Sequence, residues 1–332
     1  MTERLWPPGA ATGIGSLPGT DPTQSARLVF DELPDLPHLA ELPDRGAGAD
    51  MIGRTASLLV DLAVEIAPSG WRLSSRPGRD LRRAQDFLAR DLDALEAAGD
   101  GYAGALKVQV TGPWTLAANI EVPSGHRVVG DPGATRDLAE SLAEGLRIHL
   151  ANVGSRLPGA RLIVQLDEPG LPTVLAGYVA TPSGFGSVRA VTAEVAEQTL
   201  RSVLAVAPAG GRVVHCCATD VPIAMLRAAG ADAVAVDLAL LGRQYDALGE
   251  ALDAGTSLWL GVLPTTDVPF TPDTAREPIR RLWNALGFPV EQLAASVVPT
   301  PACGLAGATP DYARRVLATL RDVAHQMVEL SA

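Results

Sequence analysis

Eight short apolar runs recur along the chain, centred near residues 12, 38, 107, 163, 213, 234, 259 and 297. Their length and their content of valine, leucine and isoleucine are typical of buried strands. Most of them are followed by a longer run in which apolar residues recur every three or four positions, the spacing of a helix with one buried face. Strands that alternate with helices form a parallel sheet, so the pattern predicts an α/β fold.

The number of these units predicts how the sheet is closed. Eight strand–helix units make a (β/α)8 barrel, the TIM barrel, and the extra helical runs at 50–67 and 79–98 are expected to form a helical insertion between strands 2 and 3. No internal repeat and no linker divides the chain, so we expect one domain over residues 1–332. The other helices are predicted from Asp21 or Thr23 to Phe30 and over 135–153, 190–206, 222–229, 245–254, 274–286 and 311–330.

Bulk composition excludes some functions and leaves a small-molecule enzyme open. The formal net charge of −11 argues against nucleic acid as the main partner, because binding to nucleic acid needs basic patches. Three cysteines do not make an even set of disulfides, and the N-terminus has no apolar signal core, so we expect a cytoplasmic protein. No apolar run is long enough to predict a membrane span.

The candidate chemistry centres on the strand predicted at 212–216, which runs directly into a His-x-Cys pair. Strand alternation places His215 and Cys217 on one face and Cys216 on the other. The third cysteine, Cys303, follows the last predicted strand, and Asp237 ends the strand at 233–236. One imidazole, two thiolates and a carboxylate make a plausible zinc site. The chain has no Cys-x-x-Cys pair of the kind that closes a structural zinc site, so the metal would keep a position for an exogenous ligand.

Other polar residues at strand ends complete a possible substrate site. In such barrels the chemistry lies at the carboxyl ends of the strands. Asp167 and Glu168 follow the strand at 161–166 and could hold an ammonium group, while backbone amides near Ser16 could hold a carboxylate. A thiol amino acid would then lie with its sulfur on the zinc, which lowers the pKa of the thiol so that the nucleophilic thiolate exists at neutral pH.

These motifs, in this order, resemble the C-terminal catalytic barrel of cobalamin-independent methionine synthase. That barrel shares a superfamily with uroporphyrinogen decarboxylases and corrinoid-dependent methyltransferases. The resemblance implies a zinc-dependent methyltransferase that acts on a thiol, in this family homocysteine, to give methionine. It covers nearly the whole chain and rests on Ile14-Gly15-Ser16, Thr111-Gly112-Pro113 with Thr115, Gln165-Leu166-Asp167-Glu168-Pro169, His215-x-Cys217, Asp237 and Cys303-Gly304-Leu305.

The resemblance also implies roles for individual residues. His215, Cys217 and Cys303 match the family's zinc ligands. Asp237 stands where the family usually has a glutamate ligand, and because it is one methylene shorter its reach to the metal is reduced. The implied substrate contacts are the backbone at Ile14 and Ser16, the amino-group contact Asp167, and a further acidic contact from Glu41.

Three departures from the family pattern concern the methyl donor. The large N-terminal half of the full-length synthase is missing, and Asn119 stands roughly where the family has a tryptophan that stacks on folate. The segment 263–267 lacks a histidine that the family places after strand 7. We therefore expect a folate-independent homologue that takes the methyl group from another donor, such as a methylcorrinoid protein.

Two other functions stay open from the sequence. One is a metal-free lyase of the uroporphyrinogen decarboxylase type, although the first strand lacks the arginine cluster that would bind a polycarboxylate. The other is a non-catalytic metal-binding barrel that acts as a partner or chaperone for a corrinoid protein or for zinc. A zinc measurement with a homocysteine titration separates the first from the methyltransferase, and a methyl-transfer assay separates the second.

Overall fold

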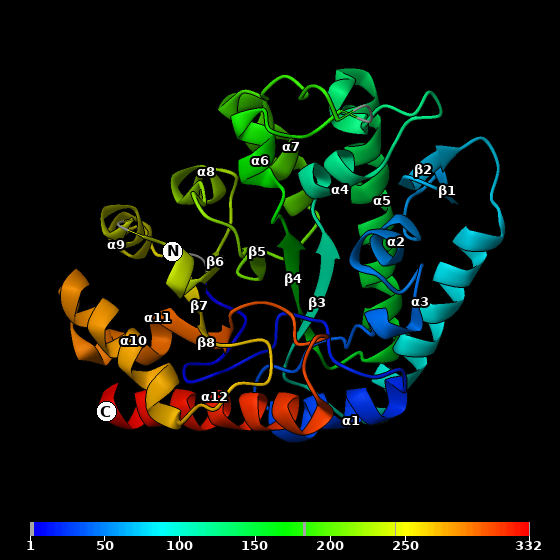
Figure 1. Cartoon of the computed structure of the whole chain (residues 1–332). Coiled ribbons are helices and arrows are strands. Elements are labelled where there is room, and N and C mark those ends of the chain that lie inside the picture. The colour runs from blue at the N-terminus through cyan, green and yellow to red at the C-terminus, as the bar shows by residue number, and fades with distance from the viewer. Residues whose placement is uncertain (1–2, 182–183, 243, 332) are drawn as a thin grey trace.

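A parallel sheet forms the centre of the fold in this computed structural model (Figure 1). The structure describes residues 3–181, 184–242 and 244–331. Within them the sheet has six strands in the order β3-β4-β5-β6-β7-β8, so each strand pairs with its neighbour in sequence. The strands are β3 Ala105–Thr111, β4 Arg161–Asp167, β5 Arg212–Cys216, β6 Ala233–Asp237, β7 Ser257–Leu263 and β8 Val297–Pro301.

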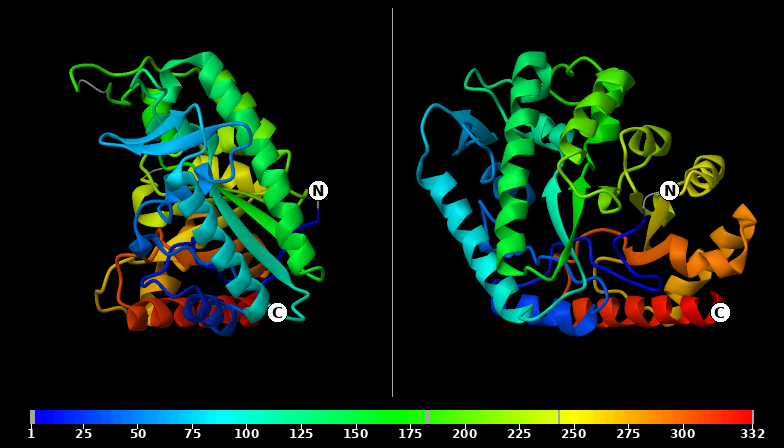
Figure 2. Two further views of the ribbon diagram at one scale, coloured as in Figure 1. Left: turned by 90° about the vertical axis from the view of Figure 1, so that its right-hand side faces the viewer. Right: turned by 180° about the vertical axis from the view of Figure 1, so that it is seen from behind.

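Helices surround the sheet and explain why its strands are apolar on both faces. Neighbouring helices pack in the pairs α1–α3, α5–α7, α7–α8, α8–α9, α9–α10, α10–α12 and α12–α1. Figure 1 and the two views of Figure 2 show α12 along one end of the molecule with α1 beside it. The long helices are α1 Pro22–Glu32, α3 Arg79–Ala98, α5 Pro132–Arg156, α7 Ala193–Leu204, α9 Tyr245–Asp253, α10 Pro272–Leu286 and α12 Pro310–Ser331. The short ones are α2 Met51–Ala56, α4 Pro113–Asn119, α6 Leu171–Ala176, α8 Ile223–Ala228 and α11 Leu293–Ser296.

Six of the eight predicted strands are regular strands, and the first two are not. Residues 10–17 and 36–42 are extended segments that join the sheet through isolated bridges between Ser16 and Glu41 and between His38 and Lys107. The first segment also accepts a backbone hydrogen bond at Ser16 from Leu305, beyond β8. The fold is therefore TIM-barrel-like, with a curled six-stranded sheet and two irregular segments between its edges.

Glycine and proline explain why these two segments are irregular. Proline has no N–H group for a strand ladder, and Pro34, Pro37 and Pro43 lie in or beside the second segment. In the first segment, a side chain at Gly13 would meet the ring of His38 at 2.4 Å, so the two segments approach more closely than side chains allow.

The region between the second segment and β3 contains a hairpin as well as helices. The helix predicted at 79–98 is confirmed by α3. The helix predicted at 50–67 is wrong in its second half, because α2 ends at Ala56 and residues 63–67 form β1, which pairs antiparallel with β2 Gly70–Ser74. The β-branched residues Val64 and Ile66 favour a strand, and Gly70, with φ of 124°, directly follows the two-residue turn at 68–69.

No helix in the described ranges combines the length and the apolar character that a membrane span needs. The side chains that fill the fold form a large apolar core between the sheet and its helices and a smaller one inside the sheet around Trp6 and Trp259. Buried polar residues such as Asp167 and His215 lie at or next to the carboxyl ends of the strands.

Candidate metal centre

Three possible metal ligands converge at the carboxyl ends of β5 and β8. His215 lies on β5, Cys217 follows it, and Cys303 lies just beyond β8. One ligand atom from each lies within 4.8 Å of the other two, and the two sulfur atoms are 3.1 Å apart. The predicted alternation on β5 is confirmed, because Cys216 is fully buried in the apolar core while His215 and Cys217 line a cavity. Burial raises the pKa of the Cys216 thiol to about 12, as expected for a structural cysteine.

The imidazole of His215 is oriented by Asp167. Its Nδ1 atom lies 2.8 Å from Asp167 Oδ1, and because a carboxylate oxygen accepts, Nδ1 carries the hydrogen. The other nitrogen, Nε2, is buried and has no hydrogen-bond partner among the described residues. A carboxylate behind one nitrogen and a free second nitrogen is the arrangement in which histidine binds zinc.

The two sulfur atoms also suit a metal. Cys217 shares a hydrogen bond with Cys303, and this bond lowers the pKa of the Cys303 thiol. A thiolate is the form of cysteine that ligates zinc. Two sulfur atoms and one nitrogen therefore fit zinc, which takes such ligands and leaves a fourth position open in catalytic sites.

The three side chains open into a cavity of about 190 Å³. Most of the predicted substrate residues line the same cavity, so the structure brings the two halves of the predicted site together. Its wall consists of Ile14, Gly15, Ser16, Glu41, Pro43, Ala49, Met51, Asp167, Pro169, His215, Cys217, Cys303 and Gly304.

The cavity wall is tight where the N-terminal segment meets the loop after β8. A side chain at Gly304 would lie 1.9 Å from the hydroxyl oxygen of Ser16. A side chain at position 304 would therefore require the Ser16 hydroxyl to move from its place beside Cys303.

Beneath the cavity lies a buried polar network. Lys107 Nζ donates to the carbonyl oxygen of Ile14 and to Gln165 Oε1, both at 2.7 Å. Gln165 Nε2 donates to the same carbonyl at 2.9 Å and to Asp167 Oδ1 at 2.7 Å. The network thus links the first extended segment, β3 and β4 to the carboxylate that holds His215.

Glu41 reaches the cavity from the second extended segment. Its carboxylate forms an ion pair with the buried guanidinium of Arg54 at 3.2 Å. Burial raises the pKa of Glu41, and the positive charge of Arg54 opposes that shift. The charge of Arg54 therefore offsets part of the cost of burying the Glu41 carboxylate at the cavity wall. Glu41 is also close enough to Asp167 for the two charges to interact.

Glu168 was predicted to contact the substrate, and the structure places it elsewhere. Its two carboxylate oxygens accept hydrogen bonds from the backbone N–H groups of Trp114 and Thr115, at 2.9 and 2.7 Å, and from the Thr115 hydroxyl. These are the free N–H groups at the start of α4, so Glu168 caps that helix. A side chain at Gly112 would lie 2.4 Å from this carboxylate, which explains the glycine of the Thr-Gly-Pro motif.

Asp237 also lies apart from the three ligands, and it is not a member of their group. Its Oδ1 atom accepts a hydrogen bond of 2.9 Å from the Ala239 backbone and caps a short 3-10 helix, η3 Leu238–Leu240. The side chain faces a separate open hollow of about 750 Å³ at the ends of β6 and β7. Its role as a fourth ligand stays a prediction without support from this geometry.

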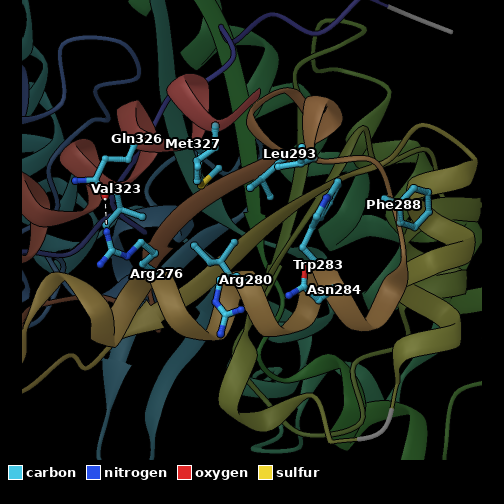
Figure 3. A pocket seen from close by; sticks show the side chains of 12 residues that line it. Arg276, Arg280, Trp283, Asn284, Phe288, Leu293, Val323, Gln326 and Met327 are labelled. Atoms are coloured by element: carbon cyan, nitrogen blue, oxygen red, sulfur yellow. Dashed lines mark hydrogen bonds between the residues drawn. The ribbon is translucent and has the colours of Figure 1, made fainter. Parts of the chain in front are cut away.

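Another hollow lies on the outside of the fold, between α10 and α12 (Figure 3). It holds about 260 Å³ and is walled by apolar residues such as Trp283, Leu293 and Met327. Its polar rim includes Arg276, which donates to Gln326 at 3.3 Å. Among the described residues its lining has no histidine, cysteine or carboxylate, and the candidate chemistry therefore belongs to the cavity above β5 and β8.

Sequence reasoning missed Lys107 and Arg54, the two buried cations of this region. A signal for Lys107 was present, because a lone lysine interrupts an apolar strand in Ala105-Leu106-Lys107-Val108. Arg54 gave no such signal, since its burial depends on how α2 packs above β3.

Comparison with known families identifies the chain. Residues 9–326 match the model of the family described as "Cobalamin-independent synthase, Catalytic domain". The chain belongs to this family. It is a methyltransferase of the methionine synthase type, and this assignment favours methyl transfer over the lyase and the non-catalytic alternatives.

The fold agrees with that of a structurally known synthase. A B12-independent methionine synthase from Shewanella sp. W3-18-1, solved in complex with selenomethionine, matches with a TM-score of 0.61 and 12% identity over 97% of this chain and 98% of that one. A GH5_18 protein from Streptomyces cattleya, in complex with GlcNAc, matches with a TM-score of 0.46 and 16% identity over 99% of this chain and 80% of that one. No curated protein sequence matches the chain.

The family assignment corrects one prediction about the donor. A methylcorrinoid protein was expected as a possible methyl donor, but the cobalamin-independent synthase family is defined by the absence of that cofactor. A corrinoid partner is therefore not supported.

Proposed function

We propose that the chain transfers a methyl group to the thiol of homocysteine, giving methionine, with zinc held by His215, Cys217 and Cys303. The observation that carries this proposal is the group of three ligand atoms within 4.8 Å, one of which is a buried imidazole nitrogen without a partner. When bound, the zinc would lower the pKa of the substrate thiol and so supply a thiolate at neutral pH. We also infer one domain, a (β/α)8 barrel in which the two extended segments take the places of strands 1 and 2.

The remaining residues of the cavity suit the rest of homocysteine. Asp167 and Glu41 are acids in the cavity lining and would attract the substrate ammonium group. Backbone groups at Ile14 and Ser16 belong to the same lining and would position the carboxylate. The Shewanella synthase was solved with selenomethionine, the selenium analogue of the expected product, which supports the same ligand class here.

These residues would act by binding and orientation. With its amino and carboxylate groups held in this way, the substrate would direct its sulfur toward His215, Cys217 and Cys303. Fixing the nucleophile in this way lowers the entropic part of the barrier for transfer. The substrate thiolate would itself be the nucleophile, so the methyl transfer would need no nucleophile from the protein.

We further propose that the methyl donor is not a folate. Asn119 provides no aromatic face, and its side-chain amide turns back to donate to the Thr115 carbonyl at 2.8 Å. The stretch Leu263-Pro264-Thr265-Thr266-Asp267 carries no imidazole, and its residues through Thr266 line the open hollow beside Asp237. These features support a donor with other binding requirements.

One assay tests both parts. The purified protein, with its zinc content measured, is incubated with homocysteine and either a methyl-folate or a simple methyl sulfonium donor, and methionine is quantified. We expect about one zinc per chain and methionine from the non-folate donor. Absence of zinc would overturn the metal-based proposal, and methionine from methyl-folate alone would overturn the folate-independent part.

A further inference from the structure

Lys107 has an unusual place in both the sequence and the fold. It is the one lysine among the 27 lysine and arginine residues of the chain. Its side chain is fully buried in the middle of β3, and it is not among the residues that line the cavity. A lysine is rarely buried without a partner, so its contacts carry information about its role.

The contacts lead in three steps to the candidate metal centre. Lys107 Nζ donates to Gln165 Oε1 at 2.7 Å, and Gln165 Nε2 donates to Asp167 Oδ1 at 2.7 Å. The same Asp167 oxygen accepts the N–H of His215 Nδ1 at 2.8 Å. All four residues are buried, with at most 6% of the surface of each exposed.

The donor-to-acceptor direction of this series of hydrogen bonds depends on Lys107. A glutamine amide can be turned by 180°, which exchanges its oxygen and its nitrogen. Lys107 donates, so it requires the oxygen of Gln165 on its side and turns the amide nitrogen toward Asp167 and the Ile14 carbonyl. In the opposite orientation the amide oxygen would face two acceptors and lose both hydrogen bonds.

We propose that Lys107 is a positioning residue for the metal centre, which acts through Gln165 and Asp167 to keep the hydrogen of His215 on Nδ1 and Nε2 free for the metal. This inference rests on the proposed function only for the identity of the metal. The tautomer of His215 is a property of the protein itself.

The type of residue fits this role. Lysine is a compact donor on a flexible stem, whereas the planar guanidinium of arginine needs more room and a different geometry. Burial lowers the pKa of Lys107 to about 7, against the opposing effect of the Asp167 and Glu41 charges. An amine and an ammonium group both have enough N–H donors for Gln165 and Ile14, so the positioning works in either form.

The test uses two variants of the network and one control. Lys107→Met removes the donor and keeps an unbranched side chain, and Gln165→Leu removes the connecting amide while Lys107 stays in place. Trp259→Phe changes a buried residue inside the sheet whose indole N–H has no partner among the described residues, so it controls for a general loss of packing. Folding of each variant is checked by circular dichroism.

Two readouts separate positioning from mere stability. The first is the 15N NMR signal of the His215 side chain in the metal-free protein, assigned by His215→Gln, which distinguishes the Nδ1–H from the Nε2–H tautomer. The second is zinc affinity by competition with a chelator, together with the visible spectrum of the cobalt-substituted protein. Loss of an outer partner of a ligating histidine typically weakens metal binding by about 10- to 100-fold.

We expect the Nδ1–H tautomer in the wild type and in Trp259→Phe, and a mixture in the two network variants. Zinc affinity should fall about tenfold in each network variant, and the double variant should be no weaker than the weaker single variant, because both act on one path.

A wild-type tautomer and affinity in Lys107→Met, or losses that multiply in the double variant, would overturn the inference. If Lys107→Met does not fold, Gln165→Leu gives the same decision. A wild type that binds no zinc would overturn the proposed function, while the tautomer would still test the role of Lys107.

Discussion

The two walls of the candidate site are built in different ways. The metal side comes from β5 and β8, regular strands whose ends deliver His215, Cys217 and Cys303. The substrate side comes largely from two extended segments that carry Ile14, Ser16 and Glu41 and join the sheet through isolated bridges and single hydrogen bonds. The backbone hydrogen bonds of the sheet fix the residues of the metal side. Close contacts at glycines and side-chain hydrogen bonds fix those of the substrate side. The two walls should therefore respond differently to substitution.

The largest expected effect is at the metal wall, where the three cysteines form a matched set. Cys217→Ala and Cys303→Ala each remove a thiolate, so zinc content should fall from about one ion per chain to near zero. Cys216→Ala, on the opposite face of the same strand, should keep its zinc. Elemental analysis after dialysis measures all three. Equal retention in the three variants would show that the sulfur pair does not hold the metal.

The next effect concerns the carboxylate between the two walls. Asp167→Asn keeps the shape of the side chain but removes the charge behind His215. Zinc affinity should fall about 10- to 100-fold, as for other outer partners of ligating histidines. Chelator competition measures it. An unchanged affinity would mean that Asp167 does not orient the ligand.

A substitution at Gly304 should affect the substrate wall alone. In Gly304→Ala the new methyl group would collide with the Ser16 hydroxyl, so homocysteine binding should weaken about tenfold, or about 1.4 kcal/mol, while zinc is retained. Adding Ser16→Gly should restore binding, because it removes the colliding atom. Gly307→Ala, where the nearest side-chain atom lies at 3.9 Å, is the matched control. Calorimetric titration measures homocysteine binding in each variant. Loss of zinc in Gly304→Ala would show that a change at the substrate wall also disturbs the metal wall.

The smallest effect is a pH dependence of the extended segments. Burial, and then the charge of Lys107, lower the pKa of His38 well below its ordinary value of 6.5. The unfolded chain therefore takes up a proton below about pH 6.5 that the folded chain does not, so this contribution to stability is present above that pH and lost as the pH falls. Urea unfolding at pH 7 and pH 5.5 should show a decrease that is smaller in His38→Gln, by about 1 kcal/mol. The surface variant His325→Gln should follow the wild type, and an equal decrease in all three would contradict the assignment to His38.

Sequence patterns predicted the metal wall better than the substrate wall. Alternation on a regular strand was enough to separate Cys217 from Cys216, and strand ends were enough to bring Cys303 to the same place. The same logic misplaced Glu168, because the choice between a cavity and the start of α4 depends on the turn at Gly112. It also continued a helix through 63–67, where β-branched residues and a turn glycine favour a hairpin.

The buried network could not be predicted from such patterns. The bonds of Lys107 join residues 93 and 58 positions away in the chain, and only the packed fold brings them together. The position of Asp237 has a similar cause, since its carboxylate accepts a hydrogen bond from the Ala239 backbone and caps η3. Local signals place a residue at a strand end, whereas tertiary packing decides where its side chain points.

The most direct test of the account is X-ray absorption at the zinc edge, with and without homocysteine. For zinc held by His215, Cys217 and Cys303 we expect two sulfur neighbours at about 2.3 Å and at least one nitrogen at about 2.0 Å in the protein alone, with a third sulfur when homocysteine is added. A first shell without two sulfur atoms, or one that homocysteine leaves unchanged, would contradict it.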